Sequence, residues 1–408
     1  MPQTVAATEG GANSSDWMFW GVFDGHAGWT TSAKLRQALI SFVARELNST
    51  YTAALSNPAV SFPSAAAIDE AIKKGFTRLD YEIVHESVQK VTKAQSKPLA
   101  AELLAPALSG SCAILSFYDS RSKELRVACT GDSRAVLGRR SGSGKWTATP
   151  LSIDQTGGTA SEDARLRAEH PNEPYVTMNG RILGGLEPSR AFGDAVYKWT
   201  RETQEFLRNK YFARQPSKHL QTPPYVTAEP VVTTTKISPE QGDFVVMATD
   251  GLWEMLTNEE VIGLVGMWLE NQRTAKSASG GGSGGWMKSL FGSSTKEHLP
   301  VENAAVAAGS GQRAPIRQQQ WGITAAQDER FVVEDKNVAT HLVRNALGGK
   351  DKEMVSALLT LPSPYSRRYR DDLTVEVIFF GEGQEGGKIE LNKEASASAS
   401  LEGVKPKL

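Results

Sequence analysis

A carboxylate and an imidazole lie two residues apart in the stretch FWGVFDGHAGWTT, which spans residues 19–31. Asp24 directly follows an apolar run, and Gly25 separates it from His26; glycine lets the backbone turn tightly and leave a carbonyl free for coordination. The unperturbed pKa of histidine lies near neutrality, so His26 beside a metal-bridging aspartate could donate a proton to a leaving oxygen. A loop histidine that is only solvated, or hydrogen-bonded to backbone, is the alternative interpretation.

Three further aspartates occupy the ends of predicted strands. Asp132 follows the apolar segment ELRVACT, Asp250 follows FVVMA, and Asp371, followed by Asp372, stands just before LTVEVIFF. Carboxylates at neighbouring strand ends can converge on one point, and because several anions within a few ångströms repel one another, such a cluster needs positive charge. Hard divalent cations such as Mg²⁺ and Mn²⁺ suit oxygen ligands. For any one aspartate alone, capping of a turn or helix is the favoured interpretation; four aspartates at strand ends weaken it, but the spacing does not decide between the two.

The composition excludes several function classes. The chain has 408 residues, of which 40% are hydrophobic, enough for one large or two medium domains with a substantial core. Because 45 basic residues balance 46 acidic ones, we expect neither a nucleic acid nor an anionic membrane as a partner. No apolar run of about 18 residues predicts a membrane span. Cys112 and Cys129 lie in strand-like segments and are expected to be free buried thiols in a reducing compartment.

Hydrophobic periodicity predicts a chain of mixed α and β structure. Residues 16–23 are aromatic-rich and predict a strand buried on both faces. Residues 30–47 and, most clearly, 68–91 predict helices whose apolar stripe packs on the core. From residue 111 onward, short strands separated by polar turns predict an antiparallel meander. The other expected elements are helices at residues 160–169, 258–269, 338–347 and 352–359, and strands at residues 244–248 and 373–380.

Two segments have the composition of irregular structure. Residues 273–325 contain SASGGGSGG and AAVAAGSGQ, and we expect a flexible insertion there because periodic structure resumes afterwards. Residues 381–408 are expected to form a disordered tail. One catalytic or binding domain is therefore expected over residues 1–380.

Six motifs occur in a fixed order: FDGHAG, SGSCA, TGDSRAVLGRR, NGRILGGLEPSRAFGD, ATDGLWEMLTNEEV and YRDDLTV. With them, residues 16–380 resemble the metal-dependent protein serine/threonine phosphatases of type 2C. The stretches AVYKWTRETQEFL, TPPYVTAEPVV and DGLWE are most similar to the pyruvate dehydrogenase phosphatase branch. This resemblance implies a phosphorylated protein substrate, with the pyruvate dehydrogenase complex as a candidate, and a mitochondrial rather than cytoplasmic location.

The resemblance also implies a fold and a metal site. The fold is α+β: a two-layer antiparallel β-sandwich flanked on both sides by antiparallel helix pairs. Asp24 would bridge two Mg²⁺ or Mn²⁺ ions, and the carbonyl of Gly25 would ligate one of them. Asp250 and Asp371 would hold the other ion, and Asp132 together with Asp250 would contribute to a weaker third site.

The mechanism that the resemblance implies is hydrolysis of phosphoserine and phosphothreonine. A water activated by two metal ions attacks phosphorus, and His26 protonates the departing oxygen, so Asp24 and His26 are the expected catalytic residues. Residues 154–180 correspond to a mobile flap beside the site. Glu162 and Arg165 match an acidic and basic pair within that flap.

The chain departs from the family pattern in two places. Asp372 occupies a position where the family often has asparagine, and we expect it only to support the site. The family also has an upstream strand with a Glu-Asp pair that completes the second metal site, and a nearby arginine that binds phosphate. Before Asp24 this chain has only Glu9 and Asp16 as acids, and no arginine or lysine. We therefore expect a truncated sequence, in which any presequence would also be missing.

Two alternatives to the enzyme remain open. The chain could be an inactive pseudophosphatase that binds a phosphoprotein or another partner through the retained fold. It could also be a carboxylate-rich metal-binding domain without phosphate chemistry.

Overall fold

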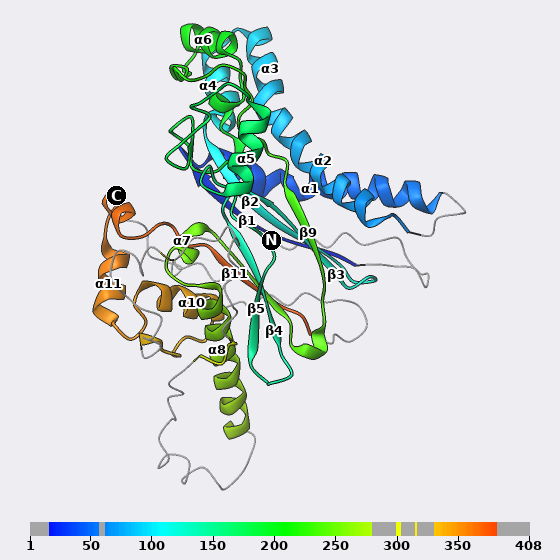
Figure 1. Ribbon diagram of the computed structural model, residues 1–408, viewed down its shortest axis with the longest axis vertical. Coiled ribbons are helices and arrows are strands. Elements are labelled where there is room, and N and C mark those ends of the chain that lie inside the picture. Colours follow the sequence, from blue (N-terminus) through cyan, green and yellow to red (C-terminus); the bar gives the residue numbers. More distant parts are fainter. Residues whose placement is uncertain (1–15, 57–61, 280–298, 303–314, 316–329, 382–408) are drawn as a thin grey trace.

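Two antiparallel β-sheets stack face to face in the computed structural model of the protein, and helices cover the outer face of each (Figure 1). The structure describes residues 16–56, 62–279, 299–302, 315 and 330–381. The predicted α+β sandwich is confirmed. The first sheet has the order β1-β2-β3-β9, with β8 also paired to β2, and comprises β1 (Trp17–His26), β2 (Gly110–Asp119), β3 (Glu124–Thr130), β8 (Phe192–Gly193) and β9 (Val231–Lys236). The second has the order β11-β10-β4-β5 and comprises β4 (Arg134–Arg140), β5 (Trp146–Pro150), β10 (Phe244–Ala248) and β11 (Val375–Phe379).

Apolar side chains from both sheets fill the space between them. Val22, Ile114 and Val127 of the first sheet form one buried cluster with Leu137 and Met247 of the second. Because successive side chains of a strand point to opposite faces, every second residue of these strands faces this inter-sheet core.

Four helices pack on the outer face of the first sheet. Lys34 forms an ion pair with Glu82 and Glu46 forms one with Lys74, each at 2.9 Å, so the first two helices run antiparallel. The apolar stripe predicted over residues 68–91 continues from α2 through a π-helical turn into α3, and it faces the sheet. The helices are α1 (Thr30–Leu55), α2 (Ala65–Tyr81), α3 (Ser87–Ala94) and α4 (Lys97–Leu108).

A second antiparallel pair, α8 and α10, packs on the outer face of the other sheet. His341 Nε2 donates to the Leu264 carbonyl, and Trp268 Nε1 donates to the Asp335 carbonyl, each at 3.0 Å. Of the helices in the described part of the chain, none is long and apolar enough to cross a membrane. The helices on this side are α7 (Asp250–Trp253), α8 (Asn258–Ser279), α10 (Val338–Leu347) and α11 (Lys352–Thr360).

Parts of the predicted insertion at residues 273–325 belong to regular structure. Helix α8 continues to Ser279, beyond the predicted end at residue 269. Further along, the Trp146 N–H donates to the Pro300 carbonyl at 2.9 Å, so residues 299–302 run beside β5. The rest of the insertion, at residues 280–298, 303–314 and 316–329, and the tail at residues 382–408 lie outside the described residues.

The strands predicted as one meander form two hairpins in different sheets, so that prediction was wrong. The hairpin β2–β3 belongs to the first sheet and β4–β5 to the second. The chain crosses between the sheets from Thr130 to Arg134. Hairpins have the same polar and apolar alternation in either sheet, so their sequence does not reveal the crossing.

Strand β1 is less buried than predicted. Only Phe19 and Val22 among its residues are buried. Among the described strands, β1 pairs with β2 alone. The elements that were not predicted include α4, which contains Pro98 and Pro106, the short α6 (Arg201–Lys210), and β9, which is threonine-rich and mostly half-exposed.

Gly75 is where α1 and α2 approach most closely, and we expect Gly75→Ala to destabilise the protein. A Cβ at this position would lie 2.7 Å from the Val43 Cα atom. Alanine normally stabilises a helix by about 1 kcal/mol relative to glycine, but forcing the helices apart costs about 1–3 kcal/mol. Urea unfolding should therefore show a lower free energy of unfolding, whereas the exposed Glu70→Ala on the same helix should change it by less than about 0.5 kcal/mol. A stabilised Gly75→Ala variant would contradict the packing described here.

Candidate active site

The predicted aspartates lie together at one end of the inter-sheet core. Asp24 lies near the end of β1, Asp132 in the crossing from β3 to β4, Asp250 just after β10, and Asp371 shortly before β11. Asp250 interacts with the other three: it hydrogen-bonds Asp24, its charge acts on Asp132, and it has a carboxylate oxygen within 4.8 Å of one from Asp371. The structure therefore brings together carboxylates that are far apart in the sequence.

Strand β1 extends further than predicted and explains the spacing of Asp24 and His26. The strand runs to His26, and the turn follows at Ala27 and Gly28, where φ is 56° and 134°. Since residues i and i+2 of a strand point to the same face, Asp24 and His26 share the face that also carries Val22. Gly25 lies between them, paired with Ser111 of β2.

Glu254 belongs to the cluster and was not predicted as a site residue. One carboxylate oxygen from each of Asp250, Glu254 and Asp371 lies within 4.8 Å of the others. Glu254 follows Asp250 by four residues, and one helical turn places such residues on the same side. The i+4 spacing in the motif DGLWE was the signal that could have identified it.

Crowding and burial make this cluster electrostatically unfavourable without a cation. Burial raises the pKa of Asp24 to about 7, and the charges of Asp250 and Asp132 contribute further. Burial, followed by the charge of Asp250, raises the pKa of Asp132 to about 7 and that of Glu254 to about 7. The pKa of Asp250 is also raised by burial, although Arg367 opposes the shift. Near neutral pH these oxygens therefore bind protons where no cation is present.

The donor set fits a hard divalent cation. One oxygen of Asp250, Oδ1, is buried and has no hydrogen-bond partner in the described part of the chain. A buried acceptor without a partner is unfavourable unless a ligand satisfies it. With three further carboxylates beside it, this oxygen matches the oxygen-rich coordination that Mg²⁺ and Mn²⁺ prefer.

The segment before β11 contributes one acidic and one basic residue to the site. Asp371 forms an ion pair with Arg367, four residues earlier. The side chain of Asp372 is 98% exposed, and it is its backbone carbonyl that accepts a hydrogen bond from Thr249 Oγ1 at 3.0 Å. Asp372 thus contacts the Asp250 segment through its backbone, which agrees with a supporting position.

His26 has a buried partner that was not predicted. Its Nε2 lies 2.5 Å from Oδ2 of Asp194, just after β8. Burial lowers the pKa of His26, but the hydrogen bond and charge of Asp194 raise it more, so that the net pKa lies above the ordinary value. Asp194 ends the motif EPSRAFGD, but nothing in its spacing connects it with His26.

The two cysteines are free and buried, as predicted. Cys112 Sγ donates to Oδ1 of Asp132 at 3.1 Å. Burial and then the charge of Asp132 raise the pKa of the Cys112 thiol, and burial and Asp154 raise that of Cys129. Since the thiolate is the reactive form, neither cysteine is a nucleophile here.

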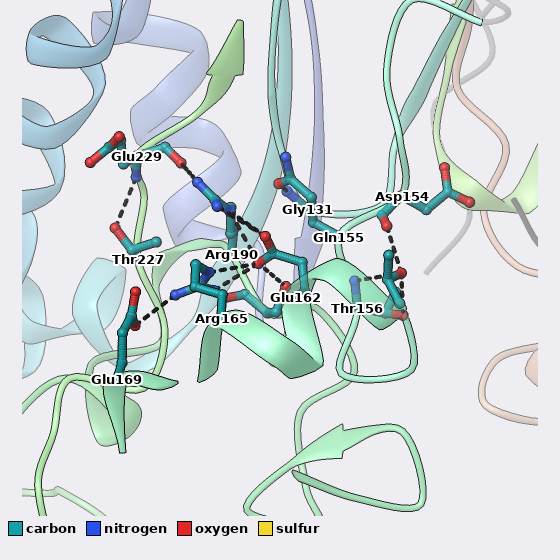
Figure 2. Close-up of polar contacts among 12 residues, drawn as sticks. Gly131, Asp154, Gln155, Thr156, Glu162, Arg165, Glu169, Arg190, Thr227 and Glu229 are labelled. Atoms are coloured by element: carbon teal, nitrogen blue, oxygen red, sulfur yellow. Dashed lines mark hydrogen bonds and ion pairs between the residues drawn. The ribbon is translucent and has the colours of Figure 1, made fainter. Parts of the chain in front are cut away.

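The predicted pair Glu162 and Arg165 is formed, and it is part of a larger ionic cluster (Figure 2). Glu162, on α5 (Ala160–Glu169), accepts hydrogen bonds from Arg165 at 2.7 Å, Arg190 at 2.9 Å and Ser189 at 2.7 Å. Burial raises the pKa of Glu162, but the hydrogen bonds from Arg190 and Arg165 outweigh it and bring it to about 2. Through Glu162, helix α5 is therefore bound to Ser189 and Arg190, in the segment just before Asp194.

The fold and the site define the class of protein: a sandwich with a carboxylate cluster suited to divalent cations and a histidine beside it. A model of the family described as "Protein phosphatase 2C" matches residues 3–280. The chain belongs to the protein phosphatase 2C family and is thus, by class, a serine/threonine protein phosphatase; this family is metal-dependent.

Several curated proteins that are similar to this chain in sequence are named as phosphatases of this kind. A protein phosphatase 2C homolog of Schizosaccharomyces pombe is 44% identical over 91% of this chain and 75% of its own length. The mitochondrial pyruvate dehydrogenase phosphatase 1 of Saccharomyces cerevisiae is 44% identical over 93% of this chain and 64% of its own length. The human mitochondrial pyruvate dehydrogenase phosphatase 2 is 33% identical over 77% of this chain, which spans 55% of that protein. Among solved structures, a serine-threonine phosphatase 2C from Toxoplasma gondii has a TM-score of 0.42 and 16% identity, over 67% of this chain and 90% of that one.

Removing metal should make the stability of the protein fall as the pH rises. A folded-state pKa of about 7 for Asp132, above the ordinary 3.8, means that its contribution is present below about pH 4 and is lost as the pH rises through 7. In EDTA, Asp132→Asn should therefore unfold at a higher temperature than the wild type, and this advantage should grow between about pH 5 and about pH 8. Thermal unfolding by circular dichroism measures it. Saturating Mn²⁺ should remove the advantage, and a pH-independent difference in EDTA would contradict the assigned repulsion.

Glu162 should stabilise the fold mainly above pH 4.5. Its folded pKa of about 2 lies below the ordinary 4.5, so its contribution of about 3 kcal/mol is present above the unfolded pKa and is lost as the pH falls through 2. Glu162→Gln should lower the free energy of urea unfolding by about that amount near pH 7 and by much less near pH 3. Glu169→Gln is the matched control, since Glu169 also binds Arg165, at 2.9 Å, but is half-exposed; its loss should stay below about 1 kcal/mol. Equal losses in the two variants would contradict the buried cluster.

Proposed function

We propose that the chain hydrolyses phosphoserine and phosphothreonine esters of protein substrates at the carboxylate cluster. The observation that carries this proposal is the convergence of four aspartates on the end of the core where His26 also lies: Asp24, Asp132 and Asp250, whose pKa values are raised, and Asp371 beside Asp250. Such a cluster favours the binding of divalent cations, and bound cations in turn favour the binding of phosphate.

The residues present suit two Mg²⁺ or Mn²⁺ ions. We assign Asp24 as the bridging ligand, the Gly25 carbonyl as a ligand of one ion, and Asp250 and Asp371 as ligands of the other; Asp132 would contribute with Asp250 to a weaker third site. Glu254 would join Asp250 and Asp371, since its carboxylate lies among theirs. When bound, such ions lower the pKa of water and offset charge on the phosphoryl oxygens.

His26 would handle the proton on the leaving side. As water forms its bond to phosphorus, the bond from phosphorus to the serine or threonine oxygen breaks, and its electron pair stays on that oxygen. His26 donates a proton there, which yields the protein hydroxyl, and the proton released by the water passes to the solvent. Proton donation matters most for an alkoxide, because it is a poor leaving group.

The substrate and location are proposed from the relatives. Two are named mitochondrial pyruvate dehydrogenase phosphatases, which supports the pyruvate dehydrogenase complex as the substrate and the mitochondrion as the location. Because the chain spans only 64% and 55% of these proteins, we treat both as proposals for this chain.

Replacing Asp250 should abolish metal-dependent turnover. Asp250→Asn removes a charge from the residue that connects the whole cluster, so we expect kcat/KM for para-nitrophenyl phosphate with Mn²⁺ to fall by about 10²-fold or more. EDTA should abolish wild-type activity likewise. The control is Glu240→Gln, exposed at the opposite end of β10, which should keep wild-type activity. Folded wild-type protein that turns over no phosphoester with Mn²⁺ would favour a non-catalytic binding module instead.

A further inference from the structure

His26 and Asp194 meet across an intervening strand. In the first sheet, His26 of β1 pairs with Gly110 of β2, and Gly110 pairs in turn with Gly193 of β8. The three residues thus form one row across the sheet, and Asp194 directly follows its last member. The side chains of His26 and Asp194 reach over Gly110 and meet with 2.5 Å between Nε2 and Oδ2.

Gly110 leaves the space in which this hydrogen bond forms. A Cβ at position 110 would lie 2.1 Å from Nε2 of His26 and 2.2 Å from Oδ2 of Asp194. Any side chain there would displace one partner or both. Glycine at this position is therefore required by the His26–Asp194 contact itself.

The backbone of Asp194 is held in an unusual conformation at this place. Its φ is 46°, a left-handed conformation that few residues other than glycine adopt, and its N–H donates to the Ser109 carbonyl at 2.9 Å. Conformations of this kind persist where the surroundings enforce them, and they concentrate at functional sites.

We propose that Asp194 is a positioning residue for His26 in the proposed phosphatase reaction, on which this inference rests. Asp194 is 5% exposed, whereas the His26 side chain is 28% exposed, so the contact fixes the ring from its buried side. The hydrogen bond at one ring nitrogen determines the role of the other. With Nε2 held by Asp194, and no partner for Nδ1 among the described residues, Nδ1 is the nitrogen that faces the leaving oxygen.

The donor and acceptor atoms of the proton transfer are then defined. As the bond from phosphorus to the substrate oxygen breaks, the proton on Nδ1 moves to that oxygen, which takes the bonding electron pair. His26 becomes neutral and retains the proton on Nε2, which Asp194 accepts as a hydrogen bond. Without Asp194 the ring can turn and the tautomer is no longer fixed, so fewer encounters present a proton at Nδ1.

The test compares leaving groups, because a good leaving group needs no proton. In Asp194→Asn we expect kcat for phenyl phosphate with Mn²⁺ to fall by about 10- to 100-fold and kcat for para-nitrophenyl phosphate by less than about 3-fold. Gly110→Ala, which keeps both side chains but fills the space between them, should give the same split. The double variant His26→Gln/Asp194→Asn should be no slower than His26→Gln alone, since both changes remove one function.

A control and a second readout separate positioning from folding. Asp80→Asn disturbs the same segment, because Asp80 binds both Gly193 and Lys198; it should lower the unfolding temperature without changing the ratio of the two rates. In metal-free protein labelled with ¹⁵N-histidine, the ring signals that disappear in His26→Gln should shift in Asp194→Asn.

The outcomes distinguish this inference from the proposed function. Equal losses on both substrates in Asp194→Asn, additive losses in the double variant, or unshifted ring signals would overturn the positioning role while leaving the phosphatase intact. A wild-type protein that turns over neither substrate with Mn²⁺ would overturn the proposed function instead.

Discussion

Burial of several carboxylates at one place, together with their mutual repulsion, is the constraint on which the rest of this structure depends. Asp24, Asp132 and Asp250 lie close enough for each to affect the ionisation of another. One pKa unit corresponds to about 1.4 kcal/mol, so ionising the cluster without a cation costs several kcal/mol, a large fraction of the typical 5–15 kcal/mol stability of a domain. The fold tolerates this cost because its stability comes from the two hydrophobic sheets and the helix pairs packed on them, away from the carboxylates.

The sandwich explains how distant residues reach one place. Strands of both sheets end at the same end of the core, and the crossing from β3 to β4 carries Asp132 from one layer to the other. Close backbone approach completes the site: a Cβ on Gly251 would lie 2.4 Å from the Asp372 carbonyl oxygen, so glycine after Asp250 lets the segment before β11 come near. Asp24, Asp132 and Asp250 are thus each placed by a strand end and an adjacent glycine, and Asp371 by the start of a strand whose approach Gly251 permits.

Long apolar stripes and alternating runs predicted most strands and helices, because they reflect burial directly, whereas the sandwich fold was implied by the family resemblance. The sequence also identified the aspartates that the structure brings together, since each stands at a strand end. Periodicity could not predict that β2–β3 and β4–β5 lie in different sheets, because either sheet demands the same alternation. Asp194 and Arg367 were missed for a related reason: their contacts with His26 and Asp371 depend on tertiary placement or local helix geometry, which motif spacing does not encode.

One short segment connects the flap with the proposed proton donor. Arg190 binds Glu162 of α5 and also donates to the Glu229 carbonyl at 2.8 Å (Figure 2). Asp194, which holds His26, follows Arg190 by four residues. Between them, β8 pairs with β2, so the segment is fixed at both ends and in the middle. The ionic cluster of α5 and the His26–Asp194 contact therefore lie on the two sides of the β8 pairing, and one segment links them.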